Sequence, residues 1–456
     1  MTELIRKKLN DSPVARWTAM FIVSFTMMCG YFITDVMASL EVMCTAPVAE
    51  GGLGWSSSEY GFFSGAYGYI NVFLLMLFFG GIILDRCGVR FTGVMSSSLM
   101  LGGALLKWYA LSTDFGDATF LGYHLQVVLA ALGFAIFGMG AEITGITVTK
   151  VIVKWFQGKE MALAMGLQVA MARIGTAVAL ACSLPLAKAM GHVSYPVLFG
   201  AICLCVGLLA YLVYCVMDKK LDRSLEAVDS DPEERFHLRD LKLIFTNKGF
   251  WLITLLCLMF YAGVFPFLKF ATKLMIAKYH VGEEMAGLIP AMLPFGTILL
   301  TPLFGSLYDR IGKGVTLMII GSVMLTLVHL LFASPFLPTW WFAIFVMVIL
   351  GIAFSLVPSA LWPSVPKIIP MKQLGSAYAT IFYIQNIGLS MVPVLIGWVI
   401  ETFSTHTAAD GQVSYDYTLP MLIFASFGII AIFLSLMLKK EDARSHYGLE
   451  ELKAKK

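Results

Sequence analysis

Long apolar stretches dominate this sequence and restrict what the chain can fold into. A helix that crosses the hydrocarbon core of a bilayer needs about 20 mainly apolar residues. The 456-residue chain contains twelve suitable stretches, at roughly 17–39, 59–84, 92–112, 123–153, 160–187, 195–216, 250–276, 284–308, 315–334, 340–366, 373–401 and 418–438. Apolar residues make up 59% of the chain and charged residues 13%, which excludes soluble, disordered, fibrous and nucleic-acid-binding proteins. We therefore predict an all-α membrane protein with 12 transmembrane helices.

The distribution of basic residues predicts how these helices are oriented. If the N-terminus is cytoplasmic, 26 of the 32 Lys and Arg residues fall in cytoplasmic segments. Only Lys188, Lys273 and Lys278 fall in the outside loops. Because basic residues concentrate on the cytoplasmic side of membrane proteins, we expect both termini to be cytoplasmic.

The polar segments divide the chain into two halves. We predict an N-terminal six-helix bundle over 1–216, a cytoplasmic linker over 217–249, a C-terminal six-helix bundle over 250–438 and a charged cytoplasmic tail over 439–456. The end of the linker, from His237 to Phe250, alternates apolar and charged residues. That pattern is compatible with a helix lying on the membrane surface.

A short motif occurs once in each half, after the second and the eighth span. The spacing Gly-x-x-x-Asp-Arg-x-Gly is shared by both copies, and Arg90 follows the first. The motif residues are Gly81, Asp85, Arg86 and Gly88 in the first half, and Gly305, Asp309, Arg310 and Gly312 in the second. The glycines permit a tight turn and close helix approach. The Asp and Arg side chains could form a cytoplasmic gate that closes in one state of a transporter, or a static salt bridge within a loop.

The two sets of six spans and the repeated motif resemble the major facilitator superfamily over essentially the whole chain. That resemblance implies two six-helix bundles around a central cavity at mid-membrane, with alternating access by rocking of the halves. Further segments resemble the branch that includes the lysosomal dipeptide transporters. They are Tyr31–Asp35, Gly140–Glu142, Trp155–Glu160, Gly166–Gln168, Met171–Gly175, Phe265–Phe267, Leu361–Pro363, Gln373–Tyr378 and Ile384–Gly388. The outside loops are short and lack Asn-x-Ser/Thr acceptors, which indicates a prokaryotic relative in the cell (inner) membrane.

Two charged residues lie deep within spans, where ionisable groups are costly and normally face a cavity or a partner. Glu142 lies 12 residues from Lys154, and Arg173 lies 14 residues from Lys159. At 1.5 Å per residue these separations are ~18 Å and ~21 Å, past the middle of the bilayer at similar heights. A carboxylate can bind an ammonium, and a guanidinium can grip a carboxylate. The resemblance implies Glu142 for the peptide N-terminus and Arg173 for its C-terminus. One alternative is a purely structural salt bridge between the two, and another is a pair that forms when the site is empty and separates for ligand.

Asp35 and Lys269 form a second candidate pair, each about 19 residues from the cytoplasmic start of its helix. We predict an outer-gate salt bridge, although Asp35 could instead bind the substrate amine or carry a proton. Lys269 could simply extend to the membrane surface, and Lys107 is expected to do so. We expect His329 to be structural.

Polar and aromatic residues in the spans are candidates for the cavity wall. They are Tyr67, Tyr69, Asn71, Gln168, Tyr261, Trp362, Tyr383, Gln385 and Asn386. Helical spacing places Tyr67 and Asn71 on one face. Each residue could equally join helices to one another without meeting substrate.

The combined prediction is a transporter of dipeptides or small peptides, either facilitative or secondary active. A proton-coupled symporter of a small organic anion is the alternative, with Glu142 as the proton site. No phosphate-binding loop, metal motif, haem motif or catalytic constellation is present in the sequence. We therefore expect no enzyme activity, no cofactor and no nucleic-acid partner, and we expect a monomer in the bilayer.

Overall fold

The computed structural model is almost entirely helical, and it describes residues 9–156, 159–225, 244–335, 337–370, 374–407 and 413–451. The first half comprises η1 (Leu9–Asp11), α1 (Pro13–Asp35), α2 (Glu41–Thr45), η2 (Val48–Glu50), α3 (Ser57–Gly65), η3 (Ala66–Gly68), α4 (Tyr69–Phe73), α5 (Met76–Ser112), β1 (Thr119–Phe120), β2 (Tyr123–His124), α6 (Leu125–Phe156), α7 (Met161–Met190) and α8 (Ser194–Leu225).

The second half comprises α10 (Lys248–Ala262), α11 (Phe265–Tyr279), α12 (Glu283–Ala286), α13 (Leu288–Ile311), α14 (Gly314–Ala333), α15 (Trp340–Ile368), α16 (Leu374–Val399), η5 (Ile400–Ser404), β3 (Thr405–Thr407), β4 (Val413–Tyr415) and α17 (Thr418–Ser445). β1 pairs with β2 and β3 with β4, both antiparallel.

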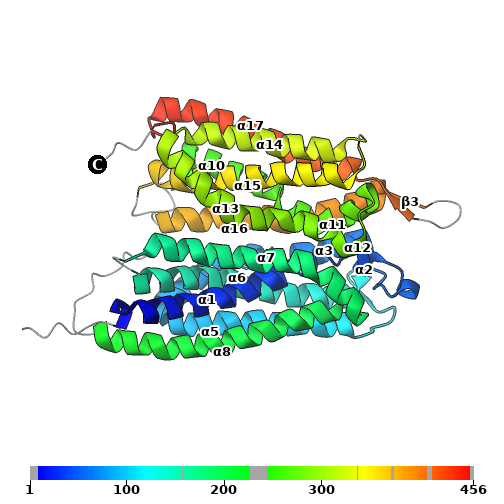
Figure 1. Ribbon diagram of the computed structural model, residues 1–456, viewed down its shortest axis with the longest axis horizontal. Helices are drawn as coiled ribbons and strands as arrows, with labels where there is room; N and C mark the ends of the chain where they lie inside the picture. The colour runs from blue at the N-terminus through cyan, green and yellow to red at the C-terminus, as the bar shows by residue number, and fades with distance from the viewer. Residues whose placement is uncertain are drawn as a thin grey trace, which may run out of the picture.

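The helices run side by side and form two bundles, one from each half of the chain (Figure 1). The bundles meet where α3 contacts α16 and where α7 contacts α13. We call the end at which α1 begins and α17 ends the terminal end, which is the predicted cytoplasmic side (Figure 1). The opposite end, which carries β3, is the hairpin end (Figure 1). The described residues include 11 helical segments long and apolar enough to cross a membrane, and the all-helical fold expected from the sequence is confirmed.

The second predicted span, 59–84, is broken rather than continuous. It passes through α3, η3 and α4 before α5 begins, and Leu75 at the last junction has a φ of 55°. Glycines make a close contact with α16 possible, because a Cβ at Gly65 would lie 2.2 Å from the carbonyl oxygen of Ser390. The same small residues that allow the two halves to touch weaken the helix that carries them.

The final glycine of the repeated motif has a positive φ in both halves. Gly88 has a φ of 75° and Gly312 a φ of 66°, so each final glycine adopts a conformation that other residues rarely take. The first glycines differ from our expectation of close helix approach. A Cβ at Gly81 or Gly305 would meet no atom within 4 Å.

The predicted linker and tail are partly helical. Residues 217–225 of the predicted linker continue α8, and α10 begins at Lys248. Residues 237–243 of the predicted surface helix lie outside the described residues. Residues 439–445 of the predicted tail continue α17, and the next residues pack against the second half. There the Lys367 ammonium donates to the Gly448 carbonyl oxygen at 2.8 Å.

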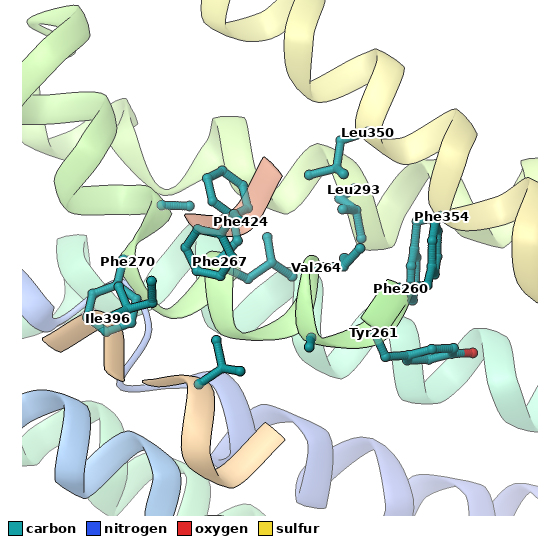
Figure 2. Close-up of a cluster of buried hydrophobic side chains, with 14 of the residues drawn as sticks. Phe260, Tyr261, Val264, Phe267, Phe270, Leu293, Leu350, Phe354, Ile396 and Phe424 are labelled. Carbon is teal, nitrogen blue, oxygen red and sulfur yellow. The ribbon is translucent and has the colours of Figure 1, made fainter. Parts of the chain in front are cut away.

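The seventh span is interrupted between α10 and α11. Gly263 ends α10, and its carbonyl oxygen accepts a hydrogen bond from Nε2 of His329 in α14 at 2.7 Å. His329 is fully buried and is structural, as the sequence predicted. Figure 2 shows that Phe267 of α11 lies beside Phe424, whereas Tyr261 of α10 points away from that cluster. Phe267 of α11 and Tyr261 of α10 therefore face different parts of the molecule on either side of the break.

Candidate functional site

A cavity of about 280 Å³ lies between the two halves. It combines charged residues, mainly from the first half, with aromatic residues, mainly from the second. Nine of the residues predicted from the sequence line it, namely Asp35, Tyr67, Glu142, Arg173, Tyr261, Lys269, Trp362, Gln385 and Asn386. The cavity is therefore large enough for a small solute and carries both signs of charge.

The Glu142 carboxylate enters the cavity from α6. The Tyr67 hydroxyl of η3 donates a hydrogen bond to its Oε1 at 2.9 Å. Close packing holds the two elements together, since a Cβ at Gly138 would lie 2.0 Å from the Tyr67 carbonyl oxygen. The Asn386 side chain of α16 also approaches the carboxylate. One hydroxyl thus orients Glu142 from its own half, and an amide reaches it from the other.

The Arg173 guanidinium enters the same cavity from α7 and crosses toward the second half. Its Cζ lies 5.2 Å from the centre of the Phe354 ring and 5.7 Å from that of Phe265. Cations are attracted to aromatic faces at such distances. Among the described residues, no carboxylate forms an ion pair with Arg173, so its hydrogen-bond donors remain available to a ligand.

Glu142 and Arg173 share the cavity without pairing with each other. The structure therefore brings the two charges together, as the depth argument predicted, but without the salt bridge that was the structural alternative. Each is held by groups that carry no full charge, Tyr67 in one case and two phenyl rings in the other. A carboxylate and a guanidinium held apart in this way present complementary charges to the two ends of a zwitterion.

Asp35 and Lys269 close the cavity toward the hairpin end. Lys269 Nζ lies 2.7 Å from Asp35 Oδ1 and donates to the Thr34 carbonyl oxygen at 2.8 Å. The other carboxylate oxygen of Asp35 accepts from the Thr176 hydroxyl at 2.8 Å. The pair predicted from the sequence is therefore in contact and joins the two halves; its action as a gate remains a prediction.

The second half supplies an aromatic wall. Trp362 Nε1 donates to the Tyr261 hydroxyl at 3.1 Å. The indole also packs against Phe382 and Tyr378, with ring centres 5.0 and 5.9 Å away. Gln385 lines the cavity beside this wall and accepts from the Cys257 thiol, with the heavy atoms 3.7 Å apart. An apolar wall with few polar anchors tolerates ligands of varied side chain.

Three predicted lining residues join helices to one another and do not line the cavity. Asn71 is fully buried and donates to the Gly138 carbonyl oxygen at 3.2 Å. The Tyr383 hydroxyl donates to the Val72 carbonyl oxygen at 3.2 Å, and Tyr69 donates to the Phe62 carbonyl oxygen at 2.9 Å. A fourth, Gln168, is half-buried on α7 and also lies outside the cavity wall. Sequence spacing did not reveal which neighbour each helix face would meet.

The expectation that Lys107 reaches the membrane surface is wrong. The side chain is fully buried, and Nζ donates to the Ile33 carbonyl oxygen at 3.0 Å. Its ammonium also lies 4.5 Å from the centre of the Phe134 ring. The physical reason is that α1 and α6 pack around this part of α5, so the nearest polar partner is a backbone carbonyl at the end of α1.

Sequence reasoning missed a second pair of charges at the hairpin end. Glu41 of α2 is fully buried, and its Oε1 lies 3.8 Å from Lys273 Nζ of α11. Neither carboxylate oxygen accepts a hydrogen bond. Burial raises the pKa of Glu41 to about 7, although the Lys273 ammonium acts in the opposite direction. The sequence feature that could have revealed this pair is the four-residue spacing of Lys269 and Lys273, which places both on the same face of a helix.

Other lining residues also escaped the sequence analysis. They are Tyr31, Thr34, Ser64, Phe265, Pro266, Phe382, Leu389 and Pro393. Tyr31, Thr34 and Phe265 fall in segments that carried the family resemblance, which was the signal that could have identified them.

At the terminal end, the motif residues form ion pairs only within the first half. Asp85 pairs with Lys150 at 3.0 Å, and Arg90 pairs with Asp222 at 2.8 Å. Arg86, Asp309 and Arg310 are exposed. No described motif residue forms an ion pair across the two halves, so the predicted gate contact is not made in this conformation.

The fold and the cavity define a membrane transporter with two helical bundles. The family model for the Major Facilitator Superfamily matches residues 20–275 and 268–455. The chain belongs to the Major Facilitator Superfamily, and it is an integral multi-pass membrane protein.

The chain is also similar to individual transporters. The chain is 27% identical over 398 residues to the lysosomal dipeptide transporter MFSD1 of Bos taurus, covering 85% of this chain and 80% of that one. It is 28% identical over 397 residues to the same transporter of Mus musculus, with coverages of 84% and 80%.

Solved structures confirm the fold. A bacterial homologue of the human lysosomal transporter Spinster, inward-facing and unoccupied, aligns with a TM-score of 0.69 at 14% identity over 95% of this chain and 98% of that one. The xylose transporter XylE from E. coli, inward open, aligns with a TM-score of 0.68 at 14% identity, with coverages of 93% and 96%.

Proposed function

We propose that this protein carries dipeptides or small peptides across the membrane by alternating access, with Glu142 binding the substrate ammonium and Arg173 binding its carboxylate. The observation that carries the proposal is the presence of both groups, unpaired with each other, in one cavity. Similarity to lysosomal dipeptide transporters supports the same substrate class. We further propose a monomer that resides in the cell (inner) membrane.

The chemistry of a peptide fits this arrangement because its two termini carry opposite charges. A guanidinium can bind a carboxylate through two parallel hydrogen bonds, which an ammonium cannot reproduce. The aromatic wall of Trp362, Tyr261 and Phe382 makes few directional demands on the side chains between the termini. The affinity for a peptide would then depend on its two charged termini, and peptides with different side chains would be accepted.

The test compares peptide flux in liposomes for wild-type protein, Glu142→Gln and Arg173→Lys. Each variant should lower kcat/KM for dipeptide by at least tenfold, because a charge-assisted hydrogen bond contributes about 1.5–3 kcal/mol. Glu284→Gln and Arg444→Lys are matched controls, since both residues are exposed and far from the cavity wall. Full peptide transport by both cavity variants would overturn the assignment.

A proton-coupled symporter of an organic anion is the second candidate, and the availability of the Arg173 donors favours it. The same variants separate the two functions. A peptide carrier loses recognition of the amine in Glu142→Gln. An anion symporter with Glu142 as its proton site loses pH dependence but still exchanges its anion, and blocking the amine of the substrate has no effect on it.

A further inference from the structure

A smaller pocket of about 60 Å³ adjoins the cavity inside the first half. It shares Tyr31, Thr34, Tyr67 and Glu142 with the main cavity. The volume accommodates roughly four to six water-sized spheres, at about 10–15 Å³ each. Glu142 therefore stands at the boundary between two spaces, with the main cavity on one side and the side pocket on the other.

The rest of the pocket wall is apolar. Gly30 and Met27 come from α1, Met100 from α5, and Ala141 and Gly145 from α6. Gly145 lies three residues after Glu142, which places both on the same face of the helix. A Cβ at Gly145 would meet only the Met27 methyl carbon, at 3.8 Å, which is ordinary van der Waals contact. The absence of a side chain at position 145 keeps the pocket open.

We infer that this side pocket receives the side chain of the amino-terminal residue of the peptide and limits its size. The inference rests on the proposed function, because it takes Glu142 as the group that binds the substrate ammonium. In a peptide, the ammonium and the first side chain are bonded to the same carbon. A carboxylate that binds the ammonium therefore places that side chain next to itself, and the pocket adjoins Glu142 there.

The wall composition indicates which side chains the pocket takes. The wall carries no charged side chain apart from Glu142, which the ammonium occupies. Two methionines, two glycines and one alanine are apolar, and the hydroxyls of Tyr67 and Thr34 already donate to Glu142 and to the Gly30 carbonyl oxygen. Unbranched methionines adapt to ligands of different shape. The pocket therefore favours small and medium apolar side chains at the first position. The side chain of the second residue lies nearer Arg173 and the aromatic wall and meets no such limit.

The test fills the pocket with a new side chain. Wild-type protein, Gly145→Leu and Gly102→Leu are compared in liposomes for flux of two dipeptide series, X-Ala and Ala-X, in which X is Ala, Val, Leu or Met. Gly102 is a matched control because it is an exposed glycine on α5 whose Cβ would meet nothing within 4 Å.

The expected result is a selective loss. Gly145→Leu should lower kcat/KM at least tenfold for Leu-Ala and Met-Ala, because methylene-sized changes in an apolar pocket alter discrimination by about 10–200-fold. Ala-Ala and the Ala-X series should change less than about twofold, and Gly102→Leu should match wild type in both series. An equal loss in the two series, or no loss in either, would overturn the inference.

Two further variants test the inference if Gly145→Leu does not fold. Gly145→Ala should give a smaller selective loss in the X-Ala series, and Met100→Ala should extend that series to Phe-Ala. If neither variant changes the relative rates of the two series, the inference is wrong. Failure of the proposed function is distinguishable, because wild-type protein would then transport neither series.

Discussion

The two ends of the molecule use charged residues in opposite ways. At the hairpin end, ion pairs join one half to the other through Asp35 with Lys269 and Glu41 with Lys273. Lys188 also pairs with Glu283 across the halves. At the terminal end, Arg16 pairs with Glu160, Lys154 with Asp218, and Lys248 with Glu441. Each of these pairs stays within one half.

The difference extends to neutral contacts. Among described residues, the hydrogen bonds and ring contacts between the halves that lie nearest the terminal end are those of Tyr383, with the Val72 carbonyl oxygen and with the Phe78 ring. Closer to the terminal end, the ion pairs between described residues hold together the helices of each half. The hairpin end is closed, and the terminal end is not closed by any such contact between the described residues.

Ion pairs within a half and ion pairs between the halves have different consequences for a conformational change. Pairs inside a half make that half move as a unit, and pairs between the halves hold one conformation. Alternating access by rocking requires the hairpin-end pairs to break when the terminal end closes. The exposed motif residues Asp85, Asp309 and Arg310 are then available for contacts in the other conformation.

The largest effect is expected from breaking the central pair at the hairpin end with Lys269→Met. Removing one partner of a buried ion pair costs about 3–5 kcal/mol because it leaves a buried charge without compensation. The population of the conformation with a closed hairpin end, relative to the conformation with an open one, should then fall at least a hundredfold. Labelling of a cysteine placed at Ser64, by a membrane-impermeant reagent added on the predicted outer side, measures this loss.

A neutral pair is the control for that experiment. The double variant Asp35→Asn with Lys269→Met removes both charges and should label much more slowly than Lys269→Met alone. Equal labelling of wild-type protein and Lys269→Met would show that the pair does not hold the hairpin end closed.

A smaller effect is expected from Glu41, whose contribution to the free energy of unfolding depends on pH. Its pKa is raised from 4.5 to about 7 in the closed conformation. The closed conformation therefore binds a proton more tightly than the unfolded chain, so the contribution of this group to stability is fully present below about pH 4.5 and is lost as pH rises through about 7. At 1.36 kcal/mol per pKa unit the loss is on the order of 3 kcal/mol.

Melting temperature against pH measures this contribution, with Glu41→Gln as the neutral comparison. The two proteins should melt together near pH 4.5, and Glu41→Gln should melt several degrees higher at pH 8. Parallel curves at all pH values would contradict the prediction.

The smallest effect on stability is expected at the terminal end, from Asp85→Asn. The pair with Lys150 is exposed, with 55% of the Asp85 side chain and 29% of the Lys150 side chain accessible. Such a pair contributes about 0–1 kcal/mol, so the melting temperature should change by no more than about a degree. Transport should nevertheless slow if, as we propose, Asp85 makes a gate contact in the conformation with a closed terminal end. Unchanged flux would remove Asp85 from the gate.

Much of the architecture could be predicted from local pattern alone. The spans, the two halves and the motif turns all depend on properties that neighbouring residues share, such as hydropathy and the conformational freedom of Gly88 and Gly312. Glu142 and Arg173 could be placed in one cavity because depth in a bilayer is proportional to residue count along a helix. These inferences needed no knowledge of how the helices rotate.

Other features depend on how each helix is rotated about its axis and on which residues distant in sequence it contacts. Helical spacing predicted that Tyr67 and Asn71 share a face, yet they lie in different elements, η3 and α4, and only Tyr67 reaches the cavity. Lys107 was expected at the surface and is buried because α1 and α6 cover it. The break in the second span lies where glycines contact α16, and the apolar pattern of residues 59–84 did not reveal that contact.

Hydropathy and helix rise already predict a chain that enters the membrane as two similar halves, with a carboxylate and a guanidinium at one depth within it. Three other features became visible in the folded molecule: Glu142 and Arg173 do not pair, a side pocket opens beside Glu142, and Glu41 is buried against Lys273. The physical reason is that these features depend on how helices far apart in sequence rotate and pack against one another.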